Sequence, residues 1–174
     1  MRLLLHSCCA PCSTTTIEKL KGDYDITVIY YNPNIEPASE YLKRKKEQIN
    51  FLNKINIPYL EIDYLNDEFS NFIKGYENEP EKGARCKLCF ELRLFKTALI
   101  AKKNNFDCFA TTLSVSPHKN TKIINEVGKD LAARLNIKYL AANFKSRDGY
   151  KRSLELSSEY NLYRQNYCGC RYSK

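Results

Sequence analysis

The 174-residue sequence predicts an α/β protein in which a parallel sheet is covered by helices on both faces. Short runs rich in β-branched and aromatic residues, such as DITVIYY at 25–31, alternate along the chain with longer segments of helical periodicity. Strands that alternate with helices form parallel sheets, because each crossover helix packs back against one face of the sheet. The length and the lack of a glycine- or proline-rich linker predict a single α/β domain over residues 1–174.

Five strands are expected. In chain order they are Leu3–His6, Asp25–Tyr31, Pro58–Asp63, Asp107–Thr112 and Ile137–Leu140. In parallel sheets, sites form at the carboxyl ends of the strands, where the strand order reverses. The loops that follow these ends are HSCCAPCS, YNPNIEP, the loop from Asp63 and TTLSVSPHKN, and they carry the unusual residue types. We therefore expect one functional site along this edge of the sheet.

Four helices are expected between the strands: Ser13–Lys21, about Ala38–Asn56, about Cys86–Lys103, and one that follows SPHKN. The first is supported by Thr15 and Glu18, which have the spacing of a capping box. Apolar residues at helical spacing predict the buried stripes of the other three: Leu42, Ile49 and Leu52; Leu88, Leu92, Phe95 and Leu99; and Ile124, Val127, Leu131 and Leu135. The stretch 64–83 is expected to be rich in loop, and the chain to end in a polar, tyrosine-rich tail.

Eight cysteines and a formal net charge of +8 set this composition apart. No apolar run approaches the roughly 20 residues that span a bilayer. The apolar part of MRLLLH is too short for a secretory signal, so we expect a cytoplasmic protein without membrane contact. Because a reducing compartment disfavours structural disulfides, clustered cysteines there indicate metal binding or redox chemistry. Excess positive charge favours a polyanionic partner.

The first cysteine group comprises Cys8, Cys9 and Cys12, between the end of a strand and the start of a helix. The positive end of a helix dipole lowers thiol pKa values there, and thiolate is the form that binds metal. Buried, inert thiols are the structural alternative. The segment Cys9-Ala-Pro-Cys12 also has the C-x-P-C pattern of thioredoxin-like redox proteins, a reading that leaves Cys8 unexplained.

Two further cysteine pairs follow. Cys86 and Cys89 form a C-x-x-C at a helix start, on a side of that helix away from its expected apolar stripe. Cys168 and Cys170 project to the same side of an extended chain, so they can face one metal or one another, or be idle thiols of a mobile tail. Cys108, alone in a strand, is expected in the core. Seven grouped thiols exceed one tetrahedral zinc and favour an iron–sulfur cluster, with thiols left for a second metal, a redox disulfide or catalysis.

Polar residues are also expected at this edge. Asp63 ends the third strand and is interpreted as an oxygen ligand or proton donor, with capping as the equal alternative. The SPHKN segment brings Ser116, His118 and Lys119 to a helix N-terminus, which can bind an anion or simply be capped.

The segment 145–174 is basic and tyrosine-rich, and we expect it to pack on the domain. Cations that contact phosphates and rings that stack on unpaired bases make this composition suitable for RNA. The run 43–46 (KRKK) is interpreted as a solvated helix face. The cations of the segment are Lys145, Arg147, Lys151, Arg152, Arg164, Arg171 and Lys174, and its tyrosines are Tyr150, Tyr160, Tyr163, Tyr167 and Tyr172.

Taken together, these segments resemble the QueH-type epoxyqueuosine reductases. The resemblance covers nearly the whole chain and runs, in order, through LLHSCCAPCS, YNPNIEPASEY, E-x-E-x-G-x-RCKLCFELRL, TTLSVSPHK and GYKRS…YRQNYCGCRYS. It implies a nucleotide-binding, Rossmann-type α/β fold of the HUP kind, related to the ATP pyrophosphatases. It also implies reduction of epoxyqueuosine in tRNA to queuosine, the last step of queuosine formation, with an external electron donor.

The resemblance further implies a [4Fe–4S] cluster and an adjacent mononuclear iron, held by cysteines and an aspartate. The carried-over ligands are Cys8, Cys9, Cys12, Cys86 and Cys89, with Cys8, Cys9, Cys86 and Cys89 assigned to the cofactor. Asp63 is chosen as the aspartate from its place at a strand end. Cys168 and Cys170 would relay electrons as a redox-active dithiol or brace the tail. His118 and Lys119 would hold a phosphate of the anticodon loop.

Two alternatives remain. A cluster-dependent tRNA sulfur-transfer enzyme would activate its substrate with ATP through a glycine-rich SGGxDS-type loop, but HSCCAPCS contains no glycine. A zinc-stabilised RNA-binding protein without catalysis would contain zinc and be colourless.

Overall fold

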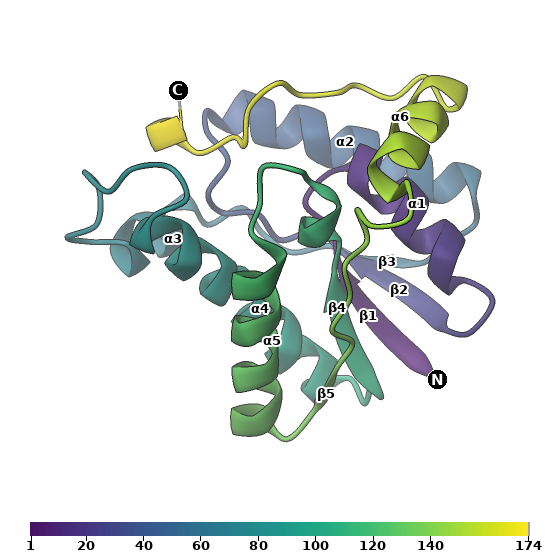
Figure 1. Ribbon diagram of the computed structural model, residues 1–174, viewed down its shortest axis with the longest axis horizontal. Helices are drawn as coiled ribbons and strands as arrows, with labels where there is room; N and C mark the ends of the chain where they lie inside the picture. The colour runs from purple at the N-terminus through teal and green to yellow at the C-terminus, as the bar shows by residue number, and fades with distance from the viewer. Residues whose placement is uncertain (174) are drawn as a thin grey trace.

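The computed structural model describes residues 1–173, and its core is one five-stranded parallel sheet in the order β3-β2-β1-β4-β5 (Figure 1). The central strand β1 pairs with β2 from Arg2↔Asp25 to His6↔Ile29, and with β4 on its other side. The predicted α/β fold class is confirmed. The strands are β1 (Arg2–His6), β2 (Asp25–Ile29), β3 (Tyr59–Leu60), β4 (Cys108–Thr111) and β5 (Lys138–Tyr139).

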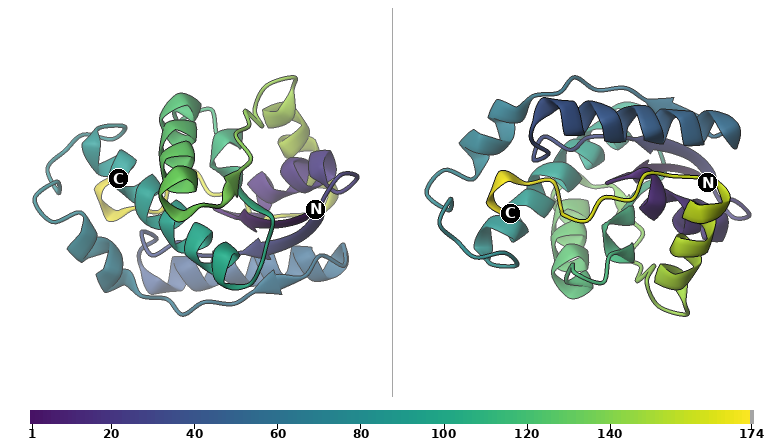
Figure 2. Two further views of the ribbon diagram at one scale, coloured as in Figure 1. Left: turned by 90° about the horizontal axis from the view of Figure 1, so that it is seen from below. Right: turned by 90° about the horizontal axis from the view of Figure 1, so that it is seen from above.

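Helices cover both faces of the sheet (Figures 1 and 2). One face carries α1 (Ala10–Leu20), α2 (Ala38–Lys54) and α6 (Gly149–Glu159). The other carries α4 (Ala84–Lys103) and α5 (Thr121–Leu135), with α3 (Asn66–Phe72) packed against α4. Two short 3-10 helices are η1 (Thr112–Val115) and η2 (Arg171–Ser173). None of the helices within residues 1–173 combines the length and apolar character needed to cross a membrane.

The leucine run of β1 explains how the two layers are held. Side chains alternate across a strand, so Leu3 and Leu5 join the core beneath α1 and α2, where Phe51 lies. Leu4 points the other way and packs with Leu94 of α4. A strand covered on both faces needs apolar residues at every position, which is what LLL provides.

The strand order reverses between β1 and β4, which lie side by side at the middle of the sheet. The loops after these two strands therefore meet. The backbone N–H of Cys8, after β1, donates to Oγ1 of Thr112, after β4, at 3.1 Å. This edge is the one at which the sequence predicts a site.

The first helix begins at Ala10, within the cysteine segment and before the predicted start at Ser13. Pro11 occupies its first turn, where the missing N–H is tolerated. The predicted capping box is wrong, because Thr15 lies inside the helix. Its buried hydroxyl oxygen has no hydrogen-bond partner among the described residues.

Two helices, α6 and α3, were not predicted from the sequence. The segment expected to be a polar tail contains α6, whose buried side includes the small polar residues Ser153 and Ser157 beside Leu156. Small polar residues allow close packing against α1 but leave little hydrophobic periodicity to detect. Likewise α3 lies in the stretch expected to be loop, and Phe69 is its buried residue. The predicted basic residue Lys174 lies outside the described residues.

The predicted apolar stripes of α2 and α4 are partly wrong, whereas that of α5 is confirmed at Ile124, Val127 and Leu131. Leu42 of α2 is 59% exposed and Leu99 of α4 is 38% exposed. Both helices instead bury polar and charged side chains, which hydrophobic periodicity does not register. For α2 these include Arg44 and Gln48, and for α4 they include Arg85, Arg93 and Thr97.

Candidate metal centre

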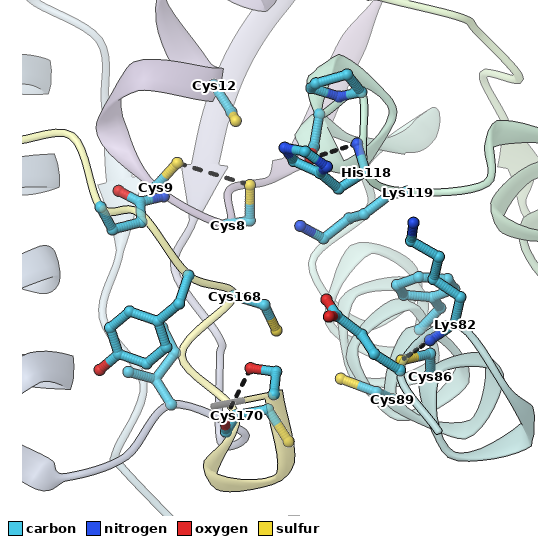
Figure 3. Close-up of a pocket in the computed structure, with 18 of the residues that line it drawn as sticks. Cys8, Cys9, Cys12, Lys82, Cys86, Cys89, His118, Lys119, Cys168 and Cys170 are labelled. Atoms are coloured by element: carbon cyan, nitrogen blue, oxygen red, sulfur yellow. Dashed lines mark hydrogen bonds between the residues drawn. The ribbon is translucent and has the colours of Figure 1, made fainter. Parts of the chain in front are cut away.

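A cavity of about 500 Å³ lies at the edge of the sheet where the loops after β1 and β4 meet. Seven of the eight cysteines line it (Figure 3). Three segments far apart in sequence supply the thiols: the loop into α1, the start of α4, and the segment after α6. The eighth, Cys108, is buried in β4, as predicted. The cavity thiols belong to Cys8, Cys9, Cys12, Cys86, Cys89, Cys168 and Cys170.

The first group is compact. The Sγ atoms of Cys8, Cys9 and Cys12 all lie within 4.8 Å of one another, and those of Cys8 and Cys9 are 3.8 Å apart. The turn from β1 into α1 sets this arrangement, with Cys9 immediately before the helix and Cys12 in its first turn. Three sulfur donors at this spacing can converge on one metal ion or cluster.

The three thiols do not share charge equally. Hydrogen bonds from the Cys12 and Cys9 thiols stabilise the Cys8 thiolate and hold its pKa well below the usual range. Thr112 adds a hydrogen bond from its hydroxyl to the Cys8 sulfur at 3.3 Å. The pKa of Cys12 lies well above its usual range because its thiol is the donor to Cys8. The group therefore presents one thiolate supported by two thiols, ready for metal to displace the remaining protons.

The second pair faces this group from α4 (Figure 3). The Cys86 sulfur accepts a hydrogen bond from the backbone N–H of Lys82 at 3.2 Å. Cys89, one turn further along, is buried, and burial raises its pKa to about 12. A thiol so buried becomes a thiolate only when a positive charge accompanies it, as a bound metal ion would provide.

The third pair is held over the cavity by α2 and the loop before it. Buried Arg44 donates from Nη1 to the carbonyl oxygen of Cys168 at 3.1 Å. The backbone N–H of Glu36 donates to the carbonyl oxygen of Gly169 at 2.8 Å. Burial raises the pKa of Cys170 to about 11. The interpretation of run 43–46 as a solvated face is thus wrong at Arg44, which anchors the C-terminal segment.

Seven lysine and arginine residues line the cavity, and two of them, Lys119 and Arg93, interact electrostatically with more than one thiol group. The Lys119 ammonium points toward Cys8 (Figure 3) and finds no hydrogen-bond acceptor among residues 1–173. Burial opposes its charge, but the negative charge of Cys8 and Cys168 outweighs this and raises the Lys119 pKa. Arg93, on the inner side of α4, is the second cation.

The other predicted site residues are placed as follows. His118 is exposed and lines the cavity. In the SPHKN segment, Asn120 caps α5 by accepting hydrogen bonds from the backbone N–H groups of Lys122 and Ile123. Asp63 is exposed and is not among the cavity-lining residues, since β3 ends at Leu60 and the strand-end argument does not extend to it.

Several cavity residues were not found from the sequence. Ser153 comes from α6, which periodicity did not resolve, whereas Tyr150 and Arg164 were named only as members of the basic, tyrosine-rich segment and not as cavity residues. Arg85 and Arg93 flank Cys89 at intervals of four residues, a spacing that places all three on one helix face. That spacing was readable in RCKLCFELR, but arginines are usually assigned to solvent.

A parallel α/β fold with a thiol-lined, cation-containing cavity where the strand order reverses is typical of enzymes whose site can bind a metal, since clustered thiolates bind metal and buried cations balance them. Sequence comparison then gives the family. The chain belongs to the epoxyqueuosine reductase QueH family, whose profile matches residues 3–174.

The sequences of named relatives match this chain over nearly all of its length and most of their own. The epoxyqueuosine reductase QueH of Streptococcus pyogenes serotype M1 is 46% identical, covering 98% of this chain and 69% of the relative. That of Acinetobacter baylyi is 45% identical, over 99% of this chain and 80% of the relative. That of Thermotoga maritima is 36% identical, over 98% and 89%.

Solved structures support the fold. The U34-tRNA thiolase NcsA from Methanococcus maripaludis, solved with its [4Fe–4S] cluster, superposes with a TM-score of 0.64 at 15% identity, over 100% of this chain and 61% of that one. A predicted subunit of tRNA methyltransferase from Methanocaldococcus jannaschii gives 0.57 at 16% identity, over 91% and 74%. At these identities the likeness establishes the architecture alone.

Proposed function

We propose that this chain reduces epoxyqueuosine to queuosine in tRNA, and that the chemistry takes place in the seven-cysteine cavity. Family membership supports the reaction, and the convergence of three thiol groups on one cavity carries the assignment of the place. We further propose that the cavity holds a [4Fe–4S] cluster and an additional mononuclear iron. The proposed ligands are drawn from Cys8, Cys9, Cys12, Cys86 and Cys89.

The donor set fits such a group. Thiolates are the ligands of iron–sulfur clusters, and the sulfurs of the first group lie close enough together to share a metal centre. Cys86 and Cys89 line the same cavity, so they can complete the coordination from α4. Asp63 as the oxygen ligand stays a prediction from the sequence, because its exposed position lends it no geometric support.

The reaction removes the epoxide oxygen as water and leaves an alkene, which requires two electrons and two protons. When bound, an iron–sulfur centre supplies the electrons one at a time, and a neighbouring iron acts as a Lewis acid toward the epoxide oxygen. The electrons come ultimately from an external donor. Lys119 is suited to give a proton to the departing oxygen, since its ammonium points into the cavity and has no hydrogen-bond acceptor within residues 1–173.

The thiols of Cys168 and Cys170 lie on the same cavity wall, where they can pass electrons as a dithiol that becomes a disulfide. In that role, both sulfurs lose a proton and an electron as the S–S bond forms. Their alternative role is to brace the C-terminal segment. His118, at the exposed side, is suited to a phosphate of the anticodon loop, which the net charge of +8 attracts.

The test uses protein reconstituted anaerobically with ferrous iron and sulfide. It is incubated with tRNA that contains epoxyqueuosine and a strong reductant, and the nucleosides released by digestion are identified by mass spectrometry. We expect conversion to queuosine, with no conversion by the metal-free protein. Iron-loaded protein that never yields queuosine would refute the proposed activity.

A further inference from the structure

Arg93 joins the two walls of the cavity. Its Nε atom donates to the carbonyl oxygen of Cys89 at 3.3 Å, and its Nη1 atom donates to Oδ1 of Asn32 at 3.0 Å. Asn32 in turn donates from Nδ2 to the carbonyl oxygen of Ser7 at 2.9 Å. A continuous chain of hydrogen bonds thus links the α4 cysteine pair to the backbone immediately before Cys8.

The guanidinium is buried without a carboxylate. Arg93 is 3% exposed, and none of the ion pairs formed within residues 1–173 includes it. By contrast, Arg44 is equally buried but pairs with Glu40 at 2.7 Å. A buried charge without a counter-charge is strongly unfavourable, so folded proteins pair such groups or bind an ion beside them.

Cysteine thiols are the ionisable acidic groups that lie around Arg93, those of Cys89, Cys168 and Cys8 among them. They become its counter-charge when metal binding converts them to thiolates. The thiol groups and Arg93 line one cavity, so a metal–thiolate centre with net negative charge would complete the pairing. Hydrogen bonds fix the guanidinium before any metal arrives, so its charge is in place without rearrangement.

We infer that Arg93 is the positioning residue of this centre, holding the two cysteine groups in mutual register and supplying the fixed positive charge that balances their metal-bound thiolates. The inference rests on the proposed metal centre and adds to it a residue that is not a ligand. A fixed cation favours the reduced, more negative state of a cluster, so Arg93 raises the reduction potential. It also raises the affinity for metal, because it favours the thiolate form of the ligands.

The experiment compares wild type with Arg93→Met, which keeps the length of the side chain without charge or hydrogen bonds, and with Arg93→Lys, which keeps the charge. Arg93→Gln, neutral but able to donate to Asn32, serves if the Met variant does not fold. Each metal-free protein is titrated with Co²⁺ in competition with a chelator, because cobalt–thiolate absorption reports binding directly. Each is then reconstituted with iron and sulfide, and its reduction midpoint is measured by spectroelectrochemistry.

We expect the Co²⁺ affinity of the neutral variants to fall about ten- to a hundredfold, as for other residues that support metal ligands. Their midpoint should move to more negative potential, whereas Arg93→Lys should stay close to wild type in both measurements. The unfolding free energy of the metal-free Met variant should change little, because removal of an uncompensated buried charge offsets the loss of its hydrogen bonds.

Neutral variants with wild-type affinity and midpoint would overturn the inference. So would a loss of stability in the metal-free protein with unchanged affinity, since that is the signature of a purely structural arginine. If wild type itself binds neither Co²⁺ nor an iron–sulfur cluster, the proposed metal centre fails instead, so the two failures are distinguishable.

Discussion

The Nη1 atom of Arg44 lies 3.1 Å from the carbonyl oxygen of Cys168, a residue 124 positions further along the chain. One side chain of α2 thereby fixes the backbone that carries the third thiol pair. The same guanidinium pairs with Glu40 at 2.7 Å, and both side chains are largely buried. The segment between α6 and η2 crosses the molecule without regular secondary structure, and this contact fixes its path over the cavity (Figure 2).

Replacement of Arg44 by Met should therefore destabilise the protein by about 3 kcal/mol, because breaking a buried pair leaves Glu40 without its counter-charge. Urea unfolding monitored by circular dichroism measures the change. The matched control is Lys46→Met on the exposed side of the same helix, which should alter stability by less than about 0.5 kcal/mol. Equal stability of both variants would show that Arg44 does not hold the C-terminal segment.

Gly169, between the two tail cysteines, has φ of +101°, and a Cβ there would lie 2.9 Å from Cγ1 of Ile35 and 3.0 Å from Nη1 of Arg44. We expect Gly169→Ala to cost about 1–2 kcal/mol from backbone strain, plus the displacement of these neighbours. Thermal unfolding measures the loss. Gly22→Ala is the control, since a Cβ at Gly22 meets nothing within 4 Å. A similar small effect of both substitutions would contradict the packing described for the tail.

The grouping of the thiols predicts distinct effects on iron content. Cys8→Ala and Cys89→Ala should each deplete the iron of anaerobically purified protein, because each removes a donor from the cavity. Cys108→Ala should retain it, since Cys108 lies in the sheet core away from the cavity. Iron is measured by colorimetric analysis of protein at matched concentration. Depletion in the Cys108 variant equal to that in the other two would show that the grouping is wrong.

Lys119→Met should lose much more activity than metal. The ammonium is not a metal ligand, but its charge favours the Cys8 thiolate, so turnover is compared per bound iron. Turnover of epoxyqueuosine-containing tRNA should fall by a factor on the order of 10² through loss of a proton donor. Lys122→Met, at an exposed position of α5, is the control for general electrostatic attraction of tRNA. If the two variants lose activity equally, Lys119 acts only through the surface field.

The layered fold could be predicted from the sequence because apolar residues are spaced differently along strands and along helices. The LLL run of β1 and the Ile124–Val127–Leu131 stripe of α5 were read correctly for that reason. The helix α6 was not predicted, because its buried residues Ser153 and Ser157 pack closely without forming a pattern of apolar residues. Each thiol group was also visible as a local pattern.

The assembly of the site could be predicted from the sequence only in part. The rule that sites form where the strand order of a parallel sheet reverses placed the first cysteine loop correctly. The position of the third pair depends on buried Arg44. Hydrophobic periodicity treats arginine as solvated, so Arg44 was assigned to a solvated face and Arg93 was not singled out. Their burial becomes apparent only when the tail and the cysteine loops are brought together in three dimensions.

The most direct test of the central claim is the iron, sulfide and zinc content of the wild-type protein after anaerobic purification. A cavity that holds an iron–sulfur centre predicts brown protein with both iron and acid-labile sulfide, and loss of both in the Cys8→Ala variant. Colourless protein that contains zinc and no sulfide, and that takes up no iron on reconstitution, would contradict the account.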